Sequence, residues 1–340
     1  AGGKGEVIAL AKATGATLWE AKVEGTVRGM AVSDGRVLAS TDTGAVYCFA
    51  AGEAPADAVR TAPAAVEPFP DDALAKLCRD AAKEILSRSG VSRGYCLVLG
   101  GSGRLAYALA RASDLTVYAV DPDAAKVAEA RKRLDAAGVY GARVVVDQGA
   151  TDALPYPDYF ANLVVSEEAL LAGKLDTSPA EVMRVLKPCG GVLCLGQPGS
   201  VPREGPKLEE AVLKAWLADP GLSGSQVSRK GGLWAKLTRG KLEGADDWSH
   251  QYGNPANTAS TEDRQVRCPL GILWYGEPGP NKVPSRHAGN AAPLCVGGRV
   301  YLQGENRVMC FDAYNGQPYW ERQLPGAYRV GMVSACSNIA

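Results

Sequence analysis

The amino-acid sequence predicts a multi-domain protein in which a doubly wound α/β domain is inserted into an all-β repeat. Three observations predict this fold class. Short strand-like runs separated by glycine turns fill residues 1–52 and return over 243–340. Between them, over 71–242, apolar strands alternate with amphipathic helices. An Ala/Pro-rich linker at 53–70 separates the two patterns, and a length of 340 residues suits more than one domain.

The two β segments are related by an internal repeat. GRVLASTDTGAVYCFA at 35–50 aligns with GRVYLQGENRVMCFDA at 298–313, with one gap. The stretches ATGATLW and AYNGQPYW also keep a glycine and a tryptophan four residues apart, as Gly15 and Trp19 in the first copy. The glycine can supply a positive φ for a turn, and the tryptophan can bury a large face on the next strand. A repeat of this kind predicts stacked β units.

The pattern A-x-x-x-x-T-G-x-x-x-W, here Ala9, Thr14, Gly15 and Trp19, resembles the PQQ-like β-propeller repeat, and the second copy carries Asn315 in place of the threonine. The resemblance, over about 1–52 and 246–340, implies a propeller that serves as a protein-binding scaffold, and binding of the quinone PQQ itself is not expected. A blade takes roughly 40 to 50 residues and a ring usually needs at least four blades. The two segments amount to about three blades, so we expect a longer protein or another chain to complete the ring.

Helix and strand signals alternate in order through the inserted domain. Asp71 or Asp72 can cap a first helix, and a capping box begins at Ser178. Such alternation predicts a doubly wound parallel sheet. At its end, SQVSRKGGLWAKLTR is typical of an antiparallel hairpin that turns at Gly231 and Gly232. The predicted strands are YCLVL, LTVYAV, 144–146, 162–166 and 192–195, and the predicted helices lie at 104–113, before Gly138, after Ser178 and at 206–218.

This terminal hairpin and two further segments resemble class I S-adenosylmethionine-dependent methyltransferases. LPYPDYFANLVVS is similar to the family's L-P-F-x-D-x-x-F-D-x-V-x-S segment around the fourth strand. EVMRVLKPCGG is similar to the E-x-x-R-V-L-K-P-G-G segment before the fifth strand. The resemblance covers about 71–242. It implies S-adenosylmethionine as the cofactor and transfer of its methyl group as the reaction.

The stretch LVLGGSGRLAYALA, followed by DLTVYAVDPD, is typical of a nucleotide site. Gly100, Gly101 and Gly103 would let the backbone approach a ligand, and the helix that follows offers free N–H groups. Asp121 lies 18 positions after Gly103, at a strand end, where a carboxylate can accept both ribose hydroxyls. Gln148, after the next strand, can flank the adenine. We therefore predict these five residues as the cofactor-binding set.

Glu167 and Glu168 follow the fourth predicted strand, at the carboxyl edge of the sheet, where open α/β folds bind ligands. Either could act as general base toward an acceptor held in line with the methyl group. An ordinary pair of surface acids is the alternative. No D/N-P-P-Y segment follows the strand, which disfavours amino methylation of DNA bases or glutamine. With only two histidines in the chain, no metal site is predicted.

Four positions depart from the methyltransferase motifs. Leu97 and Leu99 stand where the family has an acid and its first glycine. Ala150 stands at the acid on the adenine side, and Asn162 at the acid of F-D-x-V. Polar groups of the motif are changed while its hydrophobic pattern is kept. This suits either a cofactor site with fewer polar contacts than usual or a methyltransferase fold that has only a structural role.

We expect methyl transfer from S-adenosylmethionine to a small molecule or a protein, with the propeller recruiting the acceptor. Two alternatives stay open, so whether the chain is an enzyme does too. The first is a non-catalytic scaffold or interaction protein with a degenerate insert. The second is an NAD-dependent oxidoreductase, because Gly101-x-Gly103-x-x-Ala106 also satisfies the dinucleotide pattern.

The charge and hydropathy of the chain indicate which kinds of partner it is expected to bind. The formal net charge is zero, so no global field favours nucleic acid, and no apolar run approaches the roughly 20 residues of a membrane span. The nine cysteines are scattered without a metal or disulfide pattern. Free thiols favour a reducing compartment, whereas propellers of this type are commonly exported, so the localisation stays open.

Overall fold

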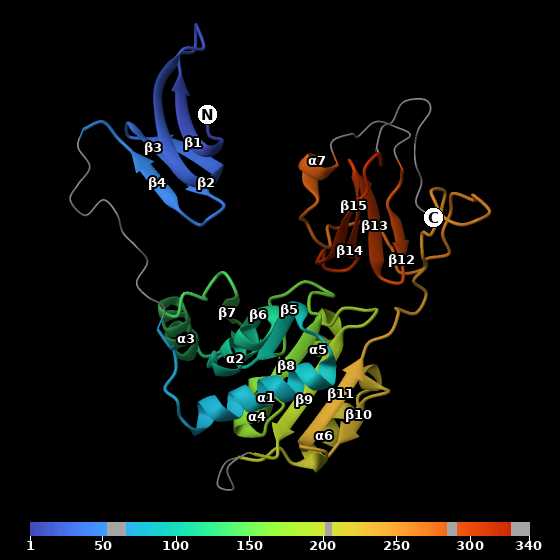
Figure 1. The fold of residues 1–340 in the computed structure, drawn as a ribbon. Helices are drawn as coiled ribbons and strands as arrows, with labels where there is room; N and C mark the ends of the chain where they lie inside the picture. The colour runs from blue at the N-terminus through green and yellow to red at the C-terminus, as the bar shows by residue number, and fades with distance from the viewer. Residues whose placement is uncertain (53–65, 201–205, 284–290, 328–340) are drawn as a thin grey trace. The chain divides into compact units, whose positions relative to one another are not determined.

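The structure is a computed structural model that describes residues 1–52, 66–200, 206–283 and 291–327 (Figure 1). The chain divides into two compact units, Ala1–Ala64 and Ala65–Ala340, and each is described by itself below. Among the described residues, no helix is both long and apolar enough to cross a membrane.

The first unit is a four-stranded antiparallel sheet in which the strands follow one another in chain order. The turn between β1 and β2 contains Gly15 at φ +72°, as the repeat predicts. Val7, Val23 and Ala39 form a small buried core. Trp19 meets Phe49 edge to face, with ring centroids 4.9 Å apart, but stays 36% exposed. The strands are β1 (Lys4–Leu10), β2 (Thr17–Ser33), β3 (Arg36–Thr41) and β4 (Val46–Phe49).

The second copy of the repeat folds into an equivalent four-stranded antiparallel sheet within the second unit. Its turn glycine, Gly316, has φ +71°, close to that of Gly15, and Trp320 is 40% exposed. Each sheet has the strand order of a propeller blade. Because the described residues form two separate sheets and no closed ring, the predicted propeller is not confirmed. The elements are α7 (Gly279–Lys282), β12 (Leu294–Val296), β13 (Arg299–Gly304), β14 (Arg307–Asp312) and β15 (Pro318–Gln323).

The middle of the chain forms the predicted doubly wound α/β domain. Its seven-stranded sheet has the order β10-β11-β9-β8-β5-β6-β7. The strands from β9 to β7 in this order are parallel, and the antiparallel pair β10 and β11 closes the other side, as the hairpin prediction requires. The strands are β5 (Arg93–Leu99), β6 (Asp114–Asp121), β7 (Val144–Gln148), β8 (Leu163–Ser166), β9 (Val192–Pro198), β10 (Gln226–Ser228) and β11 (Gly232–Thr238).

Local signals set the helix starts. Asp72 caps α1 by accepting a hydrogen bond from the Ala75 amide at 2.8 Å, and Ser178 caps α5 through the Glu181 amide at 3.2 Å. Both predicted caps are confirmed, with Asp72 chosen over Asp71. The helices are α1 (Ala73–Ser89), α2 (Arg104–Ala112), α3 (Ala124–Ala136), α4 (Glu167–Ala172), α5 (Pro179–Val185) and α6 (Glu210–Leu217), with a 3-10 turn at Pro220–Leu222.

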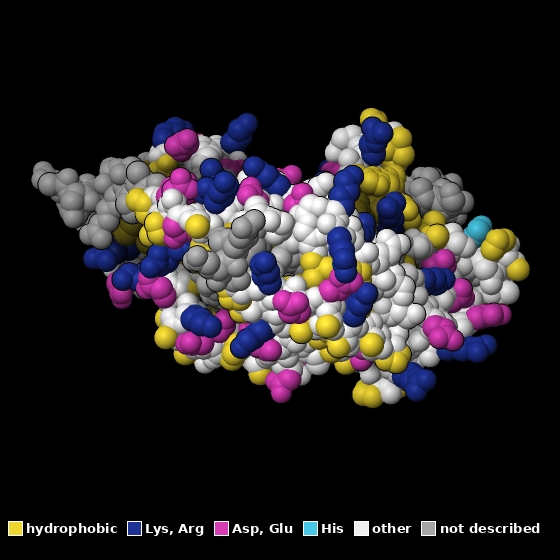
Figure 2. All heavy atoms as spheres, turned by 90° about the horizontal axis from the view of Figure 1, so that it is seen from below, with side chains coloured by type: hydrophobic (Ala, Val, Ile, Leu, Met, Phe, Trp, Pro, Cys, Tyr) yellow, Lys and Arg dark blue, Asp and Glu magenta, His cyan; other side chains and the backbone are white. Residues whose placement is uncertain are grey.

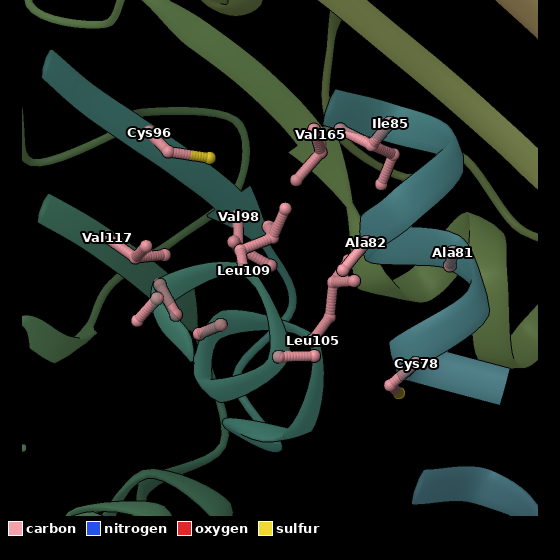
Figure 3. Packing of buried hydrophobic residues seen from close by; sticks show 14 of the residues in the cluster. Cys78, Ala81, Ala82, Ile85, Cys96, Val98, Leu105, Leu109, Val117 and Val165 are labelled. Atoms are coloured by element: carbon pink, nitrogen blue, oxygen red, sulfur yellow. The ribbon is translucent and has the colours of Figure 1, made fainter. Parts of the chain in front are cut away.

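Two hydrophobic clusters cover the two faces of the parallel sheet. Helices α1, α2 and α3 contribute to one cluster, in which Leu109 lies beside Val98 and Ile85 beside Val165 (Figure 3). Helices α5 and α6 contribute to the other. Because helices bury both faces of the parallel sheet, a ligand would contact the polar groups at the carboxyl ends of its strands.

Candidate functional site

The glycine loop between β5 and α2 lies against the end of β6. Gly100 and Gly103 have φ of +105° and +80°, conformations that favour glycine. The Gly101 amide donates to Asp121 Oδ2 at 3.0 Å. A Cβ at Gly101 would stand 2.5 Å from the Asp121 Cβ, so no other residue fits there without a shift. The loop and the acid predicted from the sequence therefore form one contact.

Asp121, the last residue of β6, is held mainly by backbone. Its Oδ1 accepts from the Asp123 amide at 2.9 Å, and the Lys126 ammonium lies 3.8 Å from Oδ2. The side chain is 5% exposed. Each carboxylate oxygen keeps a second lone pair, so two backbone donors leave acceptor capacity for a ligand hydroxyl. Asp123, rather than Asp121, caps α3 through the amides of Ala125 and Lys126.

Glu167, the first residue of α4, reaches across to the start of α2. Its Oε1 accepts from Ser102 Oγ at 2.6 Å and from the Leu105 amide at 2.9 Å, and Oε2 accepts from the Ser102 amide at 2.9 Å. The buried carboxylate thus takes the free N–H groups at the N-terminus of α2. Burial raises the pKa of Glu167, against the opposing effect of these hydrogen bonds. The arrangement positions the glycine loop and leaves little of this carboxylate for an acceptor.

Glu168 is half-buried beside the same loop. Its Cγ would stand 3.1 Å from a Cβ at Gly100. Burial raises the pKa of Glu168, and the nearby charges of Asp176 and Asp121 add to the effect. A raised pKa brings a carboxyl closer to the range in which a general base works near neutral pH. Of the two predicted catalytic acids, Glu168 is the one with room to meet a ligand.

Gln148 lies on the neighbouring strand at the same edge. It is the last residue of β7, pairs in register with Asp121, and is exposed. The structure therefore places all five predicted cofactor residues and both predicted acids at one edge of the sheet. Ser102 was not predicted, and only its place inside the glycine loop, between Gly101 and Gly103, could have indicated it.

The four departures from the motif fall in different surroundings. Leu97 and Leu99 are buried in the cluster under α5 and α6, so the acid and the glycine of the motif are replaced by side chains that pack in the core. Ala150 is exposed just after β7. Asn162 Oδ1 accepts from the Tyr95 amide at 2.9 Å, at the opposite edge of the sheet from the glycine loop. Of the four, only Ala150 is exposed, whereas Leu99 ends β5 at the same edge but is buried.

Charges of both signs lie on the face of the molecule that Figure 2 shows. Figure 2, seen from below the view of Figure 1, shows Lys and Arg side chains interspersed with Asp and Glu over the visible face. Such a surface does not attract a polyanion by charge alone. In the described ranges, no group of three or more His, Cys, Asp or Glu residues could hold a metal ion.

Glu167 should give the stability of the α/β domain a pH dependence. The ordinary pKa of the carboxyl is 4.5, and burial raises it in the folded protein. The folded state therefore binds the proton more tightly, so this contribution to stability is full below pH 4.5 and is lost as the pH rises through the higher folded pKa. We expect Glu167→Gln to remove this fall, measured as urea midpoints from about pH 4 to about pH 7. A wild-type midpoint that rises with pH relative to the midpoint of the Glu167→Gln variant would contradict the assignment.

Comparisons with known proteins agree with the two patterns read from the sequence. The family model described as "Methyltransferase domain" matches residues 98–190, and the model described as "Outer membrane protein assembly factor BamB" matches residues 1–55. No curated protein matches the chain.

Two solved structures are each similar to about half of the chain. One, from Methanococcus maripaludis and assigned as an S-adenosyl-L-methionine-dependent methyltransferase, is 23% identical, over 50% of this chain and 88% of that chain, with a TM-score of 0.39. The other, a SAM-dependent methyltransferase from Aquifex aeolicus, is 22% identical, over 49% of this chain and 93% of that chain, also with a TM-score of 0.39. The match to the methyltransferase-domain model falls within the α/β domain, and the match to the BamB model falls on the N-terminal sheet.

Proposed function

We propose that the α/β domain binds S-adenosylmethionine at the loop between β5 and α2 and transfers its methyl group to a small molecule or a protein side chain. The contact between Gly101 and Asp121 carries the proposal, because it joins a backbone without room for a side chain to an acid at the end of the next strand. The family match over residues 98–190 supports the same activity.

The residues at the carboxyl edge of the sheet each contact a different part of the cofactor or its binding loop. Asp121 accepts the ribose hydroxyls with its remaining lone pairs. The amides of the glycine loop approach the rest of the cofactor, and Gln148 flanks the adenine. Glu167 keeps the loop in place through Ser102 and Leu105.

The cofactor supplies an activated methyl group, so the protein contributes mainly position and orientation. Glu168 takes a proton from the acceptor at a carboxylate oxygen when the acceptor has one to lose. The two β-sheet segments recruit the acceptor, a role that rests on the resemblance to propeller scaffolds. Methyl transfer itself takes place at the carboxyl edge, where Glu168 lies.

The test is calorimetric titration of the full chain with S-adenosylmethionine, S-adenosylhomocysteine and NAD. We expect the two adenosyl ligands to bind at micromolar concentration. Asp121→Ala should weaken them by about 10-fold to 150-fold, the value of a hydrogen bond to a charged group. Asp123→Ala is the matched control, since it removes an acid two residues away that contacts α3 and not the loop. Tight binding of NAD alone would redirect the proposal to the oxidoreductase.

A non-catalytic insert is the second candidate, and two observations favour it. The Asp121 side chain is only 5% exposed, and Glu167 already occupies the N-terminus of α2. In that case none of the three ligands binds at millimolar concentration, while Asp121→Ala still lowers the stability of the fold. The same titration therefore separates the two candidates.

A further inference from the structure

We infer that the turn between β14 and β15 is a docking element, which fixes the C-terminal sheet on the amino edge of the methyltransferase domain and makes the two a single cooperative unit. The inference is independent of methyl transfer. It rests on contacts within the second compact unit, where the turn residues 312–317 meet the loops that precede β8 and β9.

The centre of the contact is a buried ion pair. Lys187 Nζ lies 2.7 Å from Asp312 Oδ2, and the two side chains are 2% and 0% exposed. Tyr319 donates its hydroxyl to the same oxygen at 2.7 Å. The amides of Tyr314 and Asn315 donate to Asp312 Oδ1 at 2.9 Å and 3.3 Å. Each charge has its partner on the other fold, so separating the sheet from the domain would leave both desolvated charges without their main compensation.

A second set of hydrogen bonds lies beside the pair. Asn315 Nδ2 donates to the Phe160 carbonyl and to Asn162 Oδ1, both at 2.9 Å. The same Asn162 oxygen accepts from the Tyr95 amide at the start of β5. The turn is thereby linked through one side chain to two strands of the parallel sheet.

Two residues of this contact, Asn162 and Asn315, are positions at which the chain departs from its two patterns. Asn162 replaces the acid of F-D-x-V, and Asn315 replaces the threonine of the repeat. A threonine has one hydroxyl donor and could not serve both acceptors of Asn315. Two departures from unrelated patterns therefore meet in one hydrogen bond of the junction.

The position of the junction also matters for the candidate site. Asn162 and Lys187 precede the parallel strands β8 and β9, whereas the glycine loop follows β5. In a parallel sheet these are opposite edges. The C-terminal sheet can therefore dock without covering the carboxyl edge.

Hydrogen exchange of the full chain, followed by mass spectrometry, tests the docking. In Asp312→Ala, exchange should rise at least about tenfold in the peptides of β12–β15 and also in those covering 186–191, because a buried Lys187 loses its partner. Glu321→Ala is the control, since it removes an exposed acid from β15 of the same sheet and should leave 186–191 unchanged.

Two further variants keep the test valid if Asp312→Ala unfolds. Asn315→Thr restores the residue of the repeat and should raise exchange several-fold around Tyr95 and Asn162 without unfolding the turn. The double variant Lys187→Met with Asp312→Asn removes both charges, keeps an oxygen that can accept from the turn amides, and should return much of the protection. Exchange that rises in β12–β15 alone, with 186–191 and the peptide around Tyr95 at wild-type rates, would overturn the inference.

Discussion

Leu97→Asp is expected to unfold the α/β domain, even though it restores the acid of the methyltransferase motif. Leu97 is 0% exposed on the central strand β5 and packs in a cluster with Leu99, Val164 and Leu195. Truncating a buried leucine costs about 2–5 kcal/mol, and an isolated polar group there adds several more. The sum approaches the roughly 5–15 kcal/mol by which domains of this size are stable.

Urea unfolding followed by circular dichroism measures this effect. Ala150→Asp is the matched control, because it restores the other missing acid at an exposed position and should change stability by no more than about 0.5 kcal/mol. A Leu97→Asp protein with the wild-type midpoint would show that the side chain reaches water or a ligand, which would reverse our interpretation of the motif.

Trp234→Ala should destabilise the same domain by about 3–5 kcal/mol. Trp234 is 2% exposed on β11 and packs on the cluster under α1, and the Arg88 guanidinium lies 5.1 Å from its ring centroid. The tryptophan therefore anchors the antiparallel hairpin that distinguishes this sheet from a purely parallel one.

Trp234→Phe separates the ring from its polar group in the same unfolding experiment. The Trp234 Nε1 is buried and has no hydrogen-bond partner within the described part of the chain, so its removal gives up no bond. We expect the phenylalanine variant to lose less than about 1.5 kcal/mol. Equal losses for the two substitutions would contradict this expectation, because they would mean that a phenyl ring recovers none of the packing of the indole.

Sequence patterns predicted the elements well where the signal is local. The alternation of strands and helices, the caps at Asp72 and Ser178, and the turn at Gly231 each depend on residues close together in the chain. The repeat likewise predicted equivalent strands around Gly15 and Gly316. Ring closure depends on neighbouring blades rather than on any one repeat, and this part of the prediction is not confirmed.

Contacts between residues far apart in the chain could not be predicted from the sequence. The sequence placed Glu167 at the edge of the sheet, but its bond to Leu105 joins residues 62 positions apart and has no periodic signature. The departures at Asn162 and Asn315 were visible, yet nothing in either pattern indicated that the two side chains meet. A departure from a motif therefore marked where an unusual contact lies, but it did not indicate which residue the side chain contacts.

The small N-terminal sheet affects how the molecule behaves at high concentration. In the described residues, β4 pairs with β3 alone, and Val46 on this edge strand is 74% exposed, while Val32 on β2 is 75% exposed. An open strand edge with apolar side chains can add a strand from another molecule. The edge of this sheet is therefore a place at which two copies of the chain can associate, and such association would not depend on unfolding of the large α/β domain.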